Sequence, residues 1–336
     1  MSIANDPLVE QDDLIGAIDH LASESLKLWD VPSDARSRLI NVSENATYLV
    51  ENVSGYKSIL RVHREGYHSY NGIASELAWT SALKTDGQIH TPSAIAGRNG
   101  ELIQKSTAEG LSKRYMVLFE YVDGTEPLES DDLVLPFERL GELAAITHEH
   151  SKRWLQPDFF ERMSWNLETF FGSAPTWGNW RDAPNMTSSY KSVLSECEKV
   201  ITKRLVGFGQ STNRYGLIHA DMRLANLLID NDTTHLIDFD DCGFGWNLYD
   251  FATGISFIED HPQVPLLKTA WVKGYRKVMT LSDEDEHEIE TFIMLRRIAL
   301  CAWMGTHSDV DIVKQLSPSF VPVTSVLAEK YLEHYS

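Results

Sequence analysis

Two segments decide how this sequence is interpreted: His219-Ala-Asp221-Met-Arg223-Leu-Ala-Asn226, and Asp238-Phe-Asp240 behind an apolar run. They combine a carboxylate, a guanidinium and a carboxamide in one loop, with a second carboxylate at the next expected strand end. Phosphoryl transfer depends mainly on positioning and on neutralising the charge of the phosphate oxygens, and it needs these types of side chain. The pattern therefore predicts a phosphoryl-transfer loop.

Each side chain of this loop has an expected role. Asp221 would accept the proton of an acceptor hydroxyl, and Arg223 would bind phosphate oxygens in bidentate fashion as charge develops. Mg²⁺ takes oxygen ligands, usually one or two carboxylates together with phosphate oxygens, and Asn226 Oδ1 and Asp238 would supply the protein's share. We therefore predict Asp221 and Arg223 as catalytic residues and Asn226 and Asp238 as metal ligands.

The local pattern places these residues at the ends of neighbouring strands. We expect a strand over residues 215–219 that enters the loop and another over 227–229 that leaves it. A turn at 230–233 would then lead to a paired strand over 235–238. An isolated Asp at such a place more often caps a turn or ends a strand, but the combination of residues and spacings favours a site.

These segments resemble the aminoglycoside phosphotransferase and choline kinase family, the small-molecule branch of the protein-kinase-like fold. In that family H-x-D-x-x-x-x-N carries the catalytic Asp and I-D-F carries the metal Asp. The resemblance is strongest over residues 217–251 and continues by order and spacing from about residue 36. It implies a two-lobed α+β fold, with a nucleotide-binding lobe of antiparallel strands and a leading helix over 1–121 and a mainly helical catalytic and substrate-binding lobe over 122–336.

The phosphate-binding part of the first lobe is expected between its first two strands. Residues 38–43, 46–50 and 58–62 have the composition of three antiparallel strands. The turn between the first two lacks the glycine-rich motif of protein kinases. Backbone N–H groups and the side chains of Ser43 or Asn45 would therefore cover the phosphates.

Arg61 stands on the third strand where the protein-kinase pattern has its phosphate-binding lysine. By the resemblance it would pair with Glu76, on a helix expected over about 71–83. A planar guanidinium reaches phosphate differently from an ammonium group, so Arg61 either contacts the phosphates or acts structurally.

An expected buried strand over 115–119 leads into Glu120-Tyr-Val122-Asp-Gly124, which resembles the hinge of protein kinases. By that correspondence the Glu120 carbonyl accepts from the adenine amino group and the Val122 N–H donates to a ring nitrogen. Because both roles belong to the backbone, these side chains do not distinguish ATP from GTP.

Other residues near the loop have more than one interpretation. Asp240 and Asp241 either hold a second Mg²⁺ or a cationic substrate, or cap a helix that starts near Leu248. Asp250 lies in a segment similar to the family's D-L-A and is expected to brace the backbone of the catalytic loop. His148 ends a helix expected over 136–150 and is interpreted as a core or capping residue.

The acceptor should depend on the variable part of the second lobe, where two features point to different substrates. An aromatic wall suits a quaternary amine or a sugar ring; its members would be Trp165, Phe170, Phe171, Trp177 and Trp180. Arg296 or Arg297, on a helix expected to run from a cap at Ser282 to about Met304, would instead indicate a substrate carboxylate, as in a homoserine kinase. The sequence leaves this choice open.

Composition excludes some partners. The 336 residues, 43% of them hydrophobic, suffice for a large core, and the net charge of −19 argues against nucleic acid and anionic membranes and favours a cationic acceptor. No apolar run reaches the ~18 residues of a membrane span, and the N-terminal residues do not resemble a signal peptide. The three cysteines lack metal-binding spacing, so we expect a cytoplasmic protein.

The leading hypothesis is a phosphotransferase dependent on ATP and Mg²⁺, with GTP as an open alternative. It would transfer the γ-phosphate to a hydroxyl of a small molecule, either an amine-bearing metabolite or an aminoglycoside-like compound. Alternatives within the fold are a homoserine-kinase-type enzyme and a protein Ser/Thr kinase, which would need an exposed peptide groove. A non-catalytic nucleotide-binding regulator would usually lack Asp221, Asn226 or Asp238. The oligomeric state does not follow from the sequence.

Overall fold

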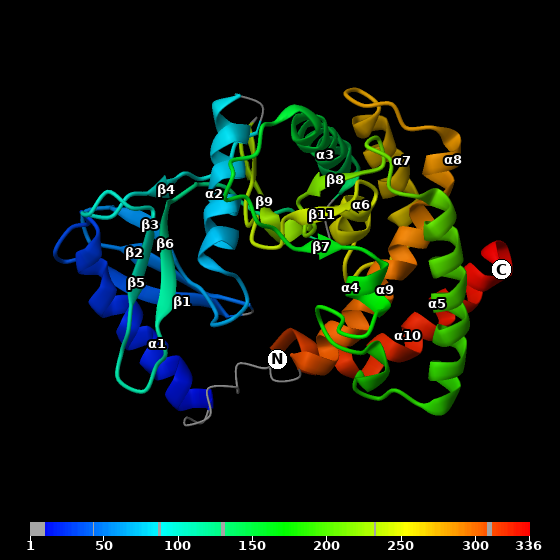
Figure 1. Ribbon diagram of the computed structural model, residues 1–336, viewed down its shortest axis with the longest axis horizontal. Helices are drawn as coiled ribbons and strands as arrows, with labels where there is room; N and C mark the ends of the chain where they lie inside the picture. The colour runs from blue at the N-terminus through cyan, green and yellow to red at the C-terminus, as the bar shows by residue number, and fades with distance from the viewer. Residues whose placement is uncertain (1–10, 43, 87–88, 129–131, 232, 308–310) are drawn as a thin grey trace. The chain divides into compact units, whose positions relative to one another are not determined.

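The computed structural model describes residues 11–42, 44–86, 89–128, 132–231, 233–307 and 311–336 (Figure 1). The chain divides into two compact units. Unit 1 comprises Met1–Ala82, Thr91–Asp123 and Gln156–Glu161, and unit 2 comprises Leu83–His90, Gly124–Leu155 and Arg162–Ser336. None of the described helices has the length and apolar character needed to cross a membrane.

Unit 1 is built on an antiparallel sheet in the order β1-β2-β3-β6-β4, with β5 also paired to β6. Its strands are β1 (Arg36–Val42), β2 (Ala46–Glu51), β3 (Lys57–Val62), β4 (Ala94–Ile95), β5 (Ile103–Ser106) and β6 (Arg114–Glu120). The three strands predicted upstream and the strand predicted before the hinge are confirmed.

Both faces of this sheet are covered, as the alternating side chains of β6 illustrate. Successive side chains of a strand point to opposite faces. Met116 and Leu118 belong to the cluster formed with α1 (Gln11–Ser25), whereas Val117 and Phe119 belong to the cluster formed with α2 (Tyr70–Thr85). A central strand buried on both sides therefore holds the two helices on opposite faces of the sheet.

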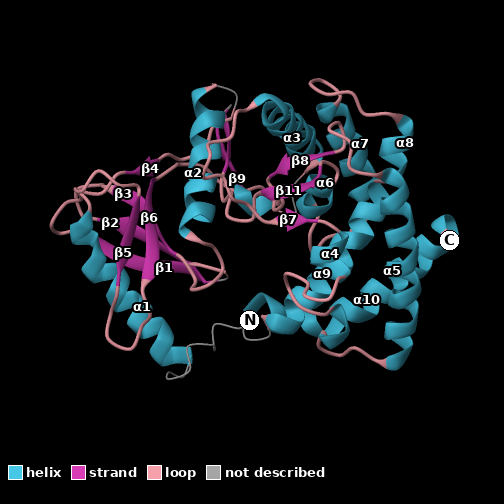
Figure 2. Ribbon diagram, viewed as in Figure 1, coloured by secondary structure: helices cyan, strands magenta, loops and turns pink. Residues whose placement is uncertain are grey.

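Unit 2 is mainly helical (Figure 2). Its longer helices are α3 (Val134–Arg153), α5 (Ser188–Phe208), α7 (Val264–Tyr275), α9 (Ile289–Thr306) and α10 (Asp311–Tyr335), and its short ones are α4 (Leu167–Phe171), α6 (Tyr249–Gly254) and α8 (Asp283–His287). The sheet β7-β11-β8 and the hairpin β9-β10 complete it, with bounds Ser164–Trp165, Gly243–Trp246, Tyr215–Ile218, Leu227–Asp230 and Thr233–Leu236 respectively.

Three local predictions need correction. Ser282 accepts a hydrogen bond from the Asp285 N–H, but it caps α8, and α9 then begins separately at Ile289. Neither Asp240 nor Asp241 caps α6, because Leu248 precedes that helix and no side chain caps it. The strand expected to reach Asp238 ends at Leu236, and Asp238 itself has a φ of 61°, which a strand cannot accommodate.

Helices α3 and α7 approach each other closely because glycines face the neighbouring backbone. A Cβ atom at Gly141 would lie 2.0 Å from the Trp271 carbonyl oxygen, and one at Gly274 would lie 1.8 Å from the Glu138 carbonyl oxygen. Real Cβ atoms cannot approach that near, so any side chain at either position would push the two helices apart.

Gly141→Ala should therefore lower the free energy of unfolding by about 1–3 kcal/mol, the usual cost of overpacking a core. Gly207→Ala is the matched control, since Gly207 also lies in a helix but a Cβ there meets nothing within 4 Å. That control should be neutral or should stabilise the protein by up to about 1 kcal/mol. Urea unfolding of both variants measures the difference, and equal stability would contradict the close approach.

Candidate active site

The carboxylate of Asp221 lies at the centre of a hydrogen-bond network in unit 2, called here the Asp221 network. Its Oδ2 accepts from Arg223 Nε at 3.1 Å and from Asn226 Nδ2 at 2.8 Å, while its Oδ1 accepts from Arg296 Nη2 at 3.0 Å. Asn226 Nδ2 also donates to the Asp221 carbonyl at 2.8 Å. Two of these partners lie in the predicted loop, and the third comes from α9.

The charge of Asp221 is stabilised despite its surroundings. Burial alone would raise the pKa of this carboxyl, but the guanidinium groups of Arg223 and Arg296 outweigh burial and hold the pKa below its ordinary range. The pKa of Arg223 is raised, mainly by the charge of Asp221. The group predicted to accept a proton is therefore ionised and has fixed hydrogen-bond partners.

The backbone of the loop is braced by Asp250, as predicted. Asp250 Oδ1 accepts from the Ala220 N–H at 2.7 Å, and Oδ2 accepts from the His219 N–H at 3.2 Å and from His148 Nε2 at 2.8 Å. Ala220 has a φ of 66°, a conformation that costs energy in a residue with a side chain. The buried carboxylate of Asp250 keeps the loop in this strained conformation.

His148 links this brace to the helix packing behind it. The residue is 1% exposed, and its Nδ1 lies 3.0 Å from the hydroxyl of Tyr275 on α7. The interpretation of His148 as a core residue is confirmed. The close approach of α3 and α7 thus supports a chain of buried hydrogen bonds that ends at the loop around Asp221.

Asn226 and Asp238 lie on adjacent segments at the end of the β9-β10 hairpin. The Ile237 N–H donates to the Asn226 carbonyl at 3.0 Å, which brings the residue before Asp238 against the loop. The negative charge of Asp238 also helps to raise the pKa of Arg223. Because Asn226 uses its amide nitrogen on Asp221, its Oδ1 is the atom suited to a metal.

A hard divalent cation fits this donor set. In the described part of the chain, no group of three or more His, Cys, Asp or Glu side chains could hold a metal ion. Mg²⁺ characteristically takes few protein ligands and completes its shell with phosphate and water oxygens, so two oxygen donors of the protein would suffice. Ligation by Asn226 and Asp238 remains a prediction.

In unit 1, Arg61 and Glu76 form the expected ion pair. Arg61 Nη1 donates to Glu76 Oε1 at 2.7 Å, and the two side chains are 10% and 2% exposed. The Arg61 guanidinium also lies over the ring of Phe119, 5.0 Å from its centroid. The pair joins β3 to α2, and its contact with phosphate remains a prediction.

The other predicted nucleotide-binding residues have different surroundings. Ser43 lies outside the described residues. Asn45 is 8% exposed, and its Oδ1 accepts from the Arg64 N–H at 3.1 Å, so this oxygen holds the segment after β3. Glu120 ends β6, and the Val122 N–H donates to no backbone carbonyl among the described residues. The nucleotide roles of all four remain predictions.

Most of the predicted aromatic wall belongs to the core. Trp165 and Trp180 are 1% and 2% exposed, and their indole N–H groups donate to the Asp241 carbonyl and to Glu198 respectively. Trp177 is also buried, and its ring lies 5.0 Å from the guanidinium of Arg296. Trp177 therefore borders the Asp221 network.

Both arginines of α9 bind acidic side chains of the protein. Arg296 bonds Asp221, and Arg297 Nη1 donates to Glu259 Oε2 at 2.5 Å. The sequence does not predict the contact with Asp221, because the two residues are 75 positions apart and nothing in the local pattern of α9 indicates which face meets the loop. Its pattern indicates Arg296 only as a partner of a substrate carboxylate.

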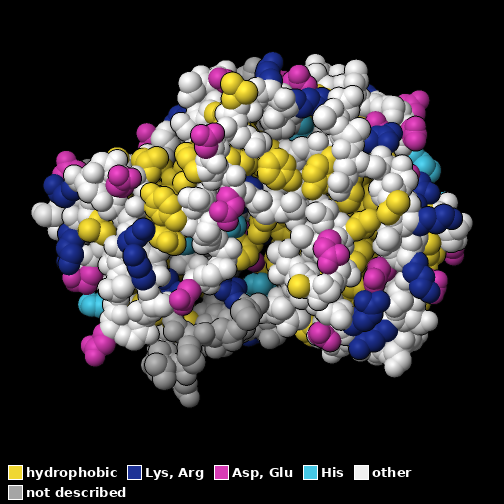
Figure 3. Space-filling view, viewed as in Figure 1, with side chains coloured by type: hydrophobic (Ala, Val, Ile, Leu, Met, Phe, Trp, Pro, Cys, Tyr) yellow, Lys and Arg dark blue, Asp and Glu magenta, His cyan; other side chains and the backbone are white. Residues whose placement is uncertain are grey.

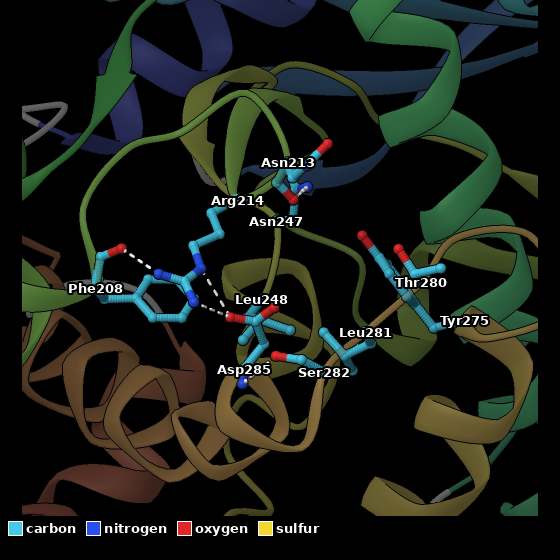
Figure 4. A pocket seen from close by; sticks show the side chains of 10 residues that line it. All are labelled: Phe208, Asn213, Arg214, Asn247, Leu248, Tyr275, Thr280, Leu281, Ser282 and Asp285. Atoms are coloured by element: carbon cyan, nitrogen blue, oxygen red, sulfur yellow. Dashed lines mark hydrogen bonds and ion pairs between the residues drawn. The ribbon is translucent and has the colours of Figure 1, made fainter.

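Unit 2 also contains a separate cavity of about 250 Å³ (Figure 4). Arg214 on its wall bonds Asp285 at 2.7 Å and the Phe208 carbonyl at 2.7 Å. Tyr275, which contacts His148, also lines this cavity, but none of the predicted catalytic or metal-binding residues does.

The antiparallel sheet of unit 1 and the braced Asp-Arg-Asn loop of unit 2 define a phosphotransferase with a protein-kinase-like fold. The chain matches the model of the phosphotransferase enzyme family over residues 37–288, and it belongs to that family. The predicted family, the α+β fold class and the assignment as a phosphotransferase acting on a small-molecule hydroxyl are confirmed.

Two kinds of small-molecule kinase are similar to this chain. The structure of a microcompartment-associated aminopropanol kinase is 42% identical, covers 93% of this chain and 97% of that chain, and has a TM-score of 0.86. An amicoumacin kinase of Bacillus subtilis (strain 168) is 21% identical over 266 residues, 76% of each chain. An amicoumacin kinase solved with AMP-PNP, Ca²⁺ and Ami is 19% identical, covers 94% and 93% of the two chains, and has a TM-score of 0.72, which shows the shared fold.

Asp250→Asn should loosen the loop, since an amide cannot accept from three N–H donors as a carboxylate does. We expect the free energy of unfolding to fall by about 2–4 kcal/mol, because buried donors lose a charged acceptor. The amide protons of His219 and Ala220 should exchange faster. Asp260→Asn, at an exposed position, is the control; unchanged exchange at both loop amides in Asp250→Asn would contradict the bracing role.

Proposed function

We propose that this protein phosphorylates the hydroxyl of a short amino alcohol, with ATP and Mg²⁺. The observation that carries this proposal is the 42% identity to an aminopropanol kinase over nearly the whole of both chains, together with an intact Asp221 network. The solved relative with AMP-PNP and Ca²⁺ supports the use of a nucleotide and a divalent metal.

The residues of the loop suit the steps of this reaction. Ionised Asp221 accepts the hydrogen bond of the acceptor hydroxyl, which orients that oxygen toward phosphorus, and then takes its proton. Arg223 lies beside Asp221 and supplies positive charge for the transferring phosphoryl group. Asn226 Oδ1 and Asp238 would hold Mg²⁺, which when bound neutralises charge on the phosphate oxygens.

Nucleotide binding is assigned to residues of unit 1. The buried pair with Glu76 fixes the Arg61 guanidinium, which we propose contacts phosphate oxygens. The Glu120 carbonyl and the Val122 N–H are proposed to bond the adenine edge. Of the two residues proposed for the phosphate-covering turn, Asn45 uses its side-chain oxygen on the Arg64 N–H, so its contribution would come from its remaining groups.

The surroundings favour an amine over a carboxylate as the second group of the acceptor. Arg296 and Arg297, the cations that would suit a carboxylate, are paired with Asp221 and Glu259. The chain carries a net charge of −19, and acidic side chains are scattered over both units in the view of Figure 3. This charge favours a cationic acceptor over an amino acid such as homoserine.

We also propose a reducing location, the cytoplasm. Cys197, Cys242 and Cys301 are buried and form no disulfide within the described residues, which agrees with a compartment in which disulfides do not form.

An acceptor panel tests the proposed function. ADP release would be measured with Mg²⁺ and ATP in the presence of 1-amino-2-propanol, ethanolamine, choline, homoserine, an aminoglycoside or a Ser/Thr peptide, and the product identified by ³¹P NMR. The expected result is a phosphomonoester of a short amino alcohol. Turnover confined to homoserine or to the peptide, or no turnover with any acceptor, would contradict the proposal.

Asp221→Asn should reduce kcat by about 10²–10⁴-fold, the usual contribution of a positioned base. The Kd for AMP-PNP should stay within about two-fold, because the side chain acts on the acceptor and not on the nucleotide. Asp230→Asn, an exposed change in the neighbouring hairpin, is the matched control. A variant at position 221 with wild-type turnover would remove this residue from the mechanism.

Asp238→Ala should weaken binding of AMP-PNP by at least about ten-fold when Mg²⁺ is present, because the metal ion loses one of its few protein ligands. Without Mg²⁺ the variant and the wild-type protein should bind AMP-PNP equally. Calorimetric titrations with Mg²⁺ and with EDTA compare the two conditions. Equal weakening in both would assign Asp238 to the nucleotide pocket instead of the metal.

A further inference from the structure

We propose that Arg296 is a positioning residue of the phosphoryl transfer, which fixes the orientation of the Asp221 carboxylate toward the acceptor hydroxyl. This inference rests on the proposed function of Asp221. It concerns a residue of α9, far in sequence from the loop, and it gives this guanidinium a role other than substrate binding.

The guanidinium of Arg296 is held at each of its three nitrogen atoms by a different residue. Nε donates to Ser256 Oγ at 2.9 Å, Nη1 to the Tyr249 hydroxyl at 3.2 Å, and Nη2 to Asp221 Oδ1 at 3.0 Å. A planar group bonded in three directions cannot rotate without breaking a bond. Its contact with Asp221 therefore has a defined direction.

Aromatic rings restrict the same group further. The guanidinium carbon lies 5.0 Å from the centroid of Trp177 and 5.7 Å from that of Tyr249, and Arg296 is 3% exposed. A buried guanidinium surrounded by rings and hydrogen-bond acceptors has little freedom to swing into solvent. Arg296 is thus a rigid support and not a mobile surface cation.

The hydrogen bonds of Asp221 are divided unequally between its two oxygens. Oδ2 accepts from both Arg223 and Asn226, whereas Oδ1 accepts from Arg296 alone among the described residues. Each carboxylate oxygen can accept about two hydrogen bonds in the carboxylate plane. Oδ1 therefore retains the acceptor capacity for the substrate, and Arg296 determines the direction in which it points.

The transfer at Oδ1 forms one phosphorus–oxygen bond and breaks another. The acceptor hydroxyl donates its hydrogen bond to Oδ1, its oxygen forms a bond to the γ-phosphorus, and the bond from that phosphorus to the β,γ-bridging oxygen breaks. The proton passes to Asp221, and the electron pair of the broken bond stays on ADP. Arg296 takes part in no bond change, but its position sets the angle at which the hydroxyl approaches.

The neighbouring residue offers a matched comparison. Arg297 is 2% exposed and pairs with Glu259, and it also bonds Thr324 of α10. It is a buried cation on the same helix with a carboxylate partner outside the loop. Effects that follow merely from disturbing a buried arginine of α9 should therefore appear at both positions.

Steady-state kinetics of Arg296→Lys, Arg296→Ala and Arg297→Lys test the role. Arg296→Lys keeps the charge but not the three-way hydrogen bonding, and it should lower kcat by about 10–100-fold with the KM for ATP within about two-fold. Arg296→Ala should lower kcat further, and millimolar methylguanidinium should restore part of the kcat of this variant. Arg297→Lys should melt at a lower temperature, keep its kcat and gain nothing from methylguanidinium. Wild-type kcat in Arg296→Lys, or no rescue of a folded Arg296→Ala, would overturn the proposal.

A melting-temperature cycle separates this inference from the choice of acceptor. Arg296→Ala should lower the melting temperature more in the wild-type background than in an Asp221→Asn background, because the pair is already weakened there. Equal melting-temperature shifts in the two backgrounds would overturn the coupling between Arg296 and Asp221, whether or not an acceptor is known. Unequal shifts, together with no turnover on any acceptor, would instead refute the proposed function.

Discussion

The ionised carboxylate of Asp221 is the group on which the rest of the site depends. Taking a carboxylate largely out of water is costly unless charged or hydrogen-bonding partners replace its hydration. Here Arg223, Asn226 and Arg296 do so, from the loop on one side and from α9 on the other. The same partners that make this burial possible also fix the direction in which the carboxylate can accept a proton.

The scaffold behind the loop has a comparable constraint at Asp250. Its two oxygens accept hydrogen bonds from the N–H groups of His219 and Ala220 and from one ring nitrogen of His148. Helices α3 and α6 therefore both contribute to the conformation of the loop. The positive φ angle of Ala220 persists because the hydrogen bonds from the loop to Asp250 enforce it. The strained residue therefore lies next to Asp221, and the buried bonds from Asp250 through His148 to Tyr275 connect it to the packing of α3 against α7.

Features that depend on near neighbours in sequence were predictable. The spacing from Asp221 to Asn226, the hairpin that follows and the Arg61–Glu76 pair all emerge from strand and helix periods combined with a family resemblance. The contact of Arg296 with Asp221 was not predictable, because it depends on how distant helices pack. The separation of α8 from α9 and the left-handed Asp238 were likewise decided by tertiary packing, which overrides local pattern.

The most direct test is a crystal structure of the protein with AMP-PNP, Mg²⁺ and 1-amino-2-propanol. The account predicts that the acceptor hydroxyl lies within about 2.6–3.2 Å of Asp221 Oδ1, the reach of a general base, with Arg296 still bonded to that oxygen. Asn226 Oδ1 and Asp238 should ligate the metal. A hydroxyl bound elsewhere, or an Asp221 side chain turned away from the acceptor in the complex, would contradict it.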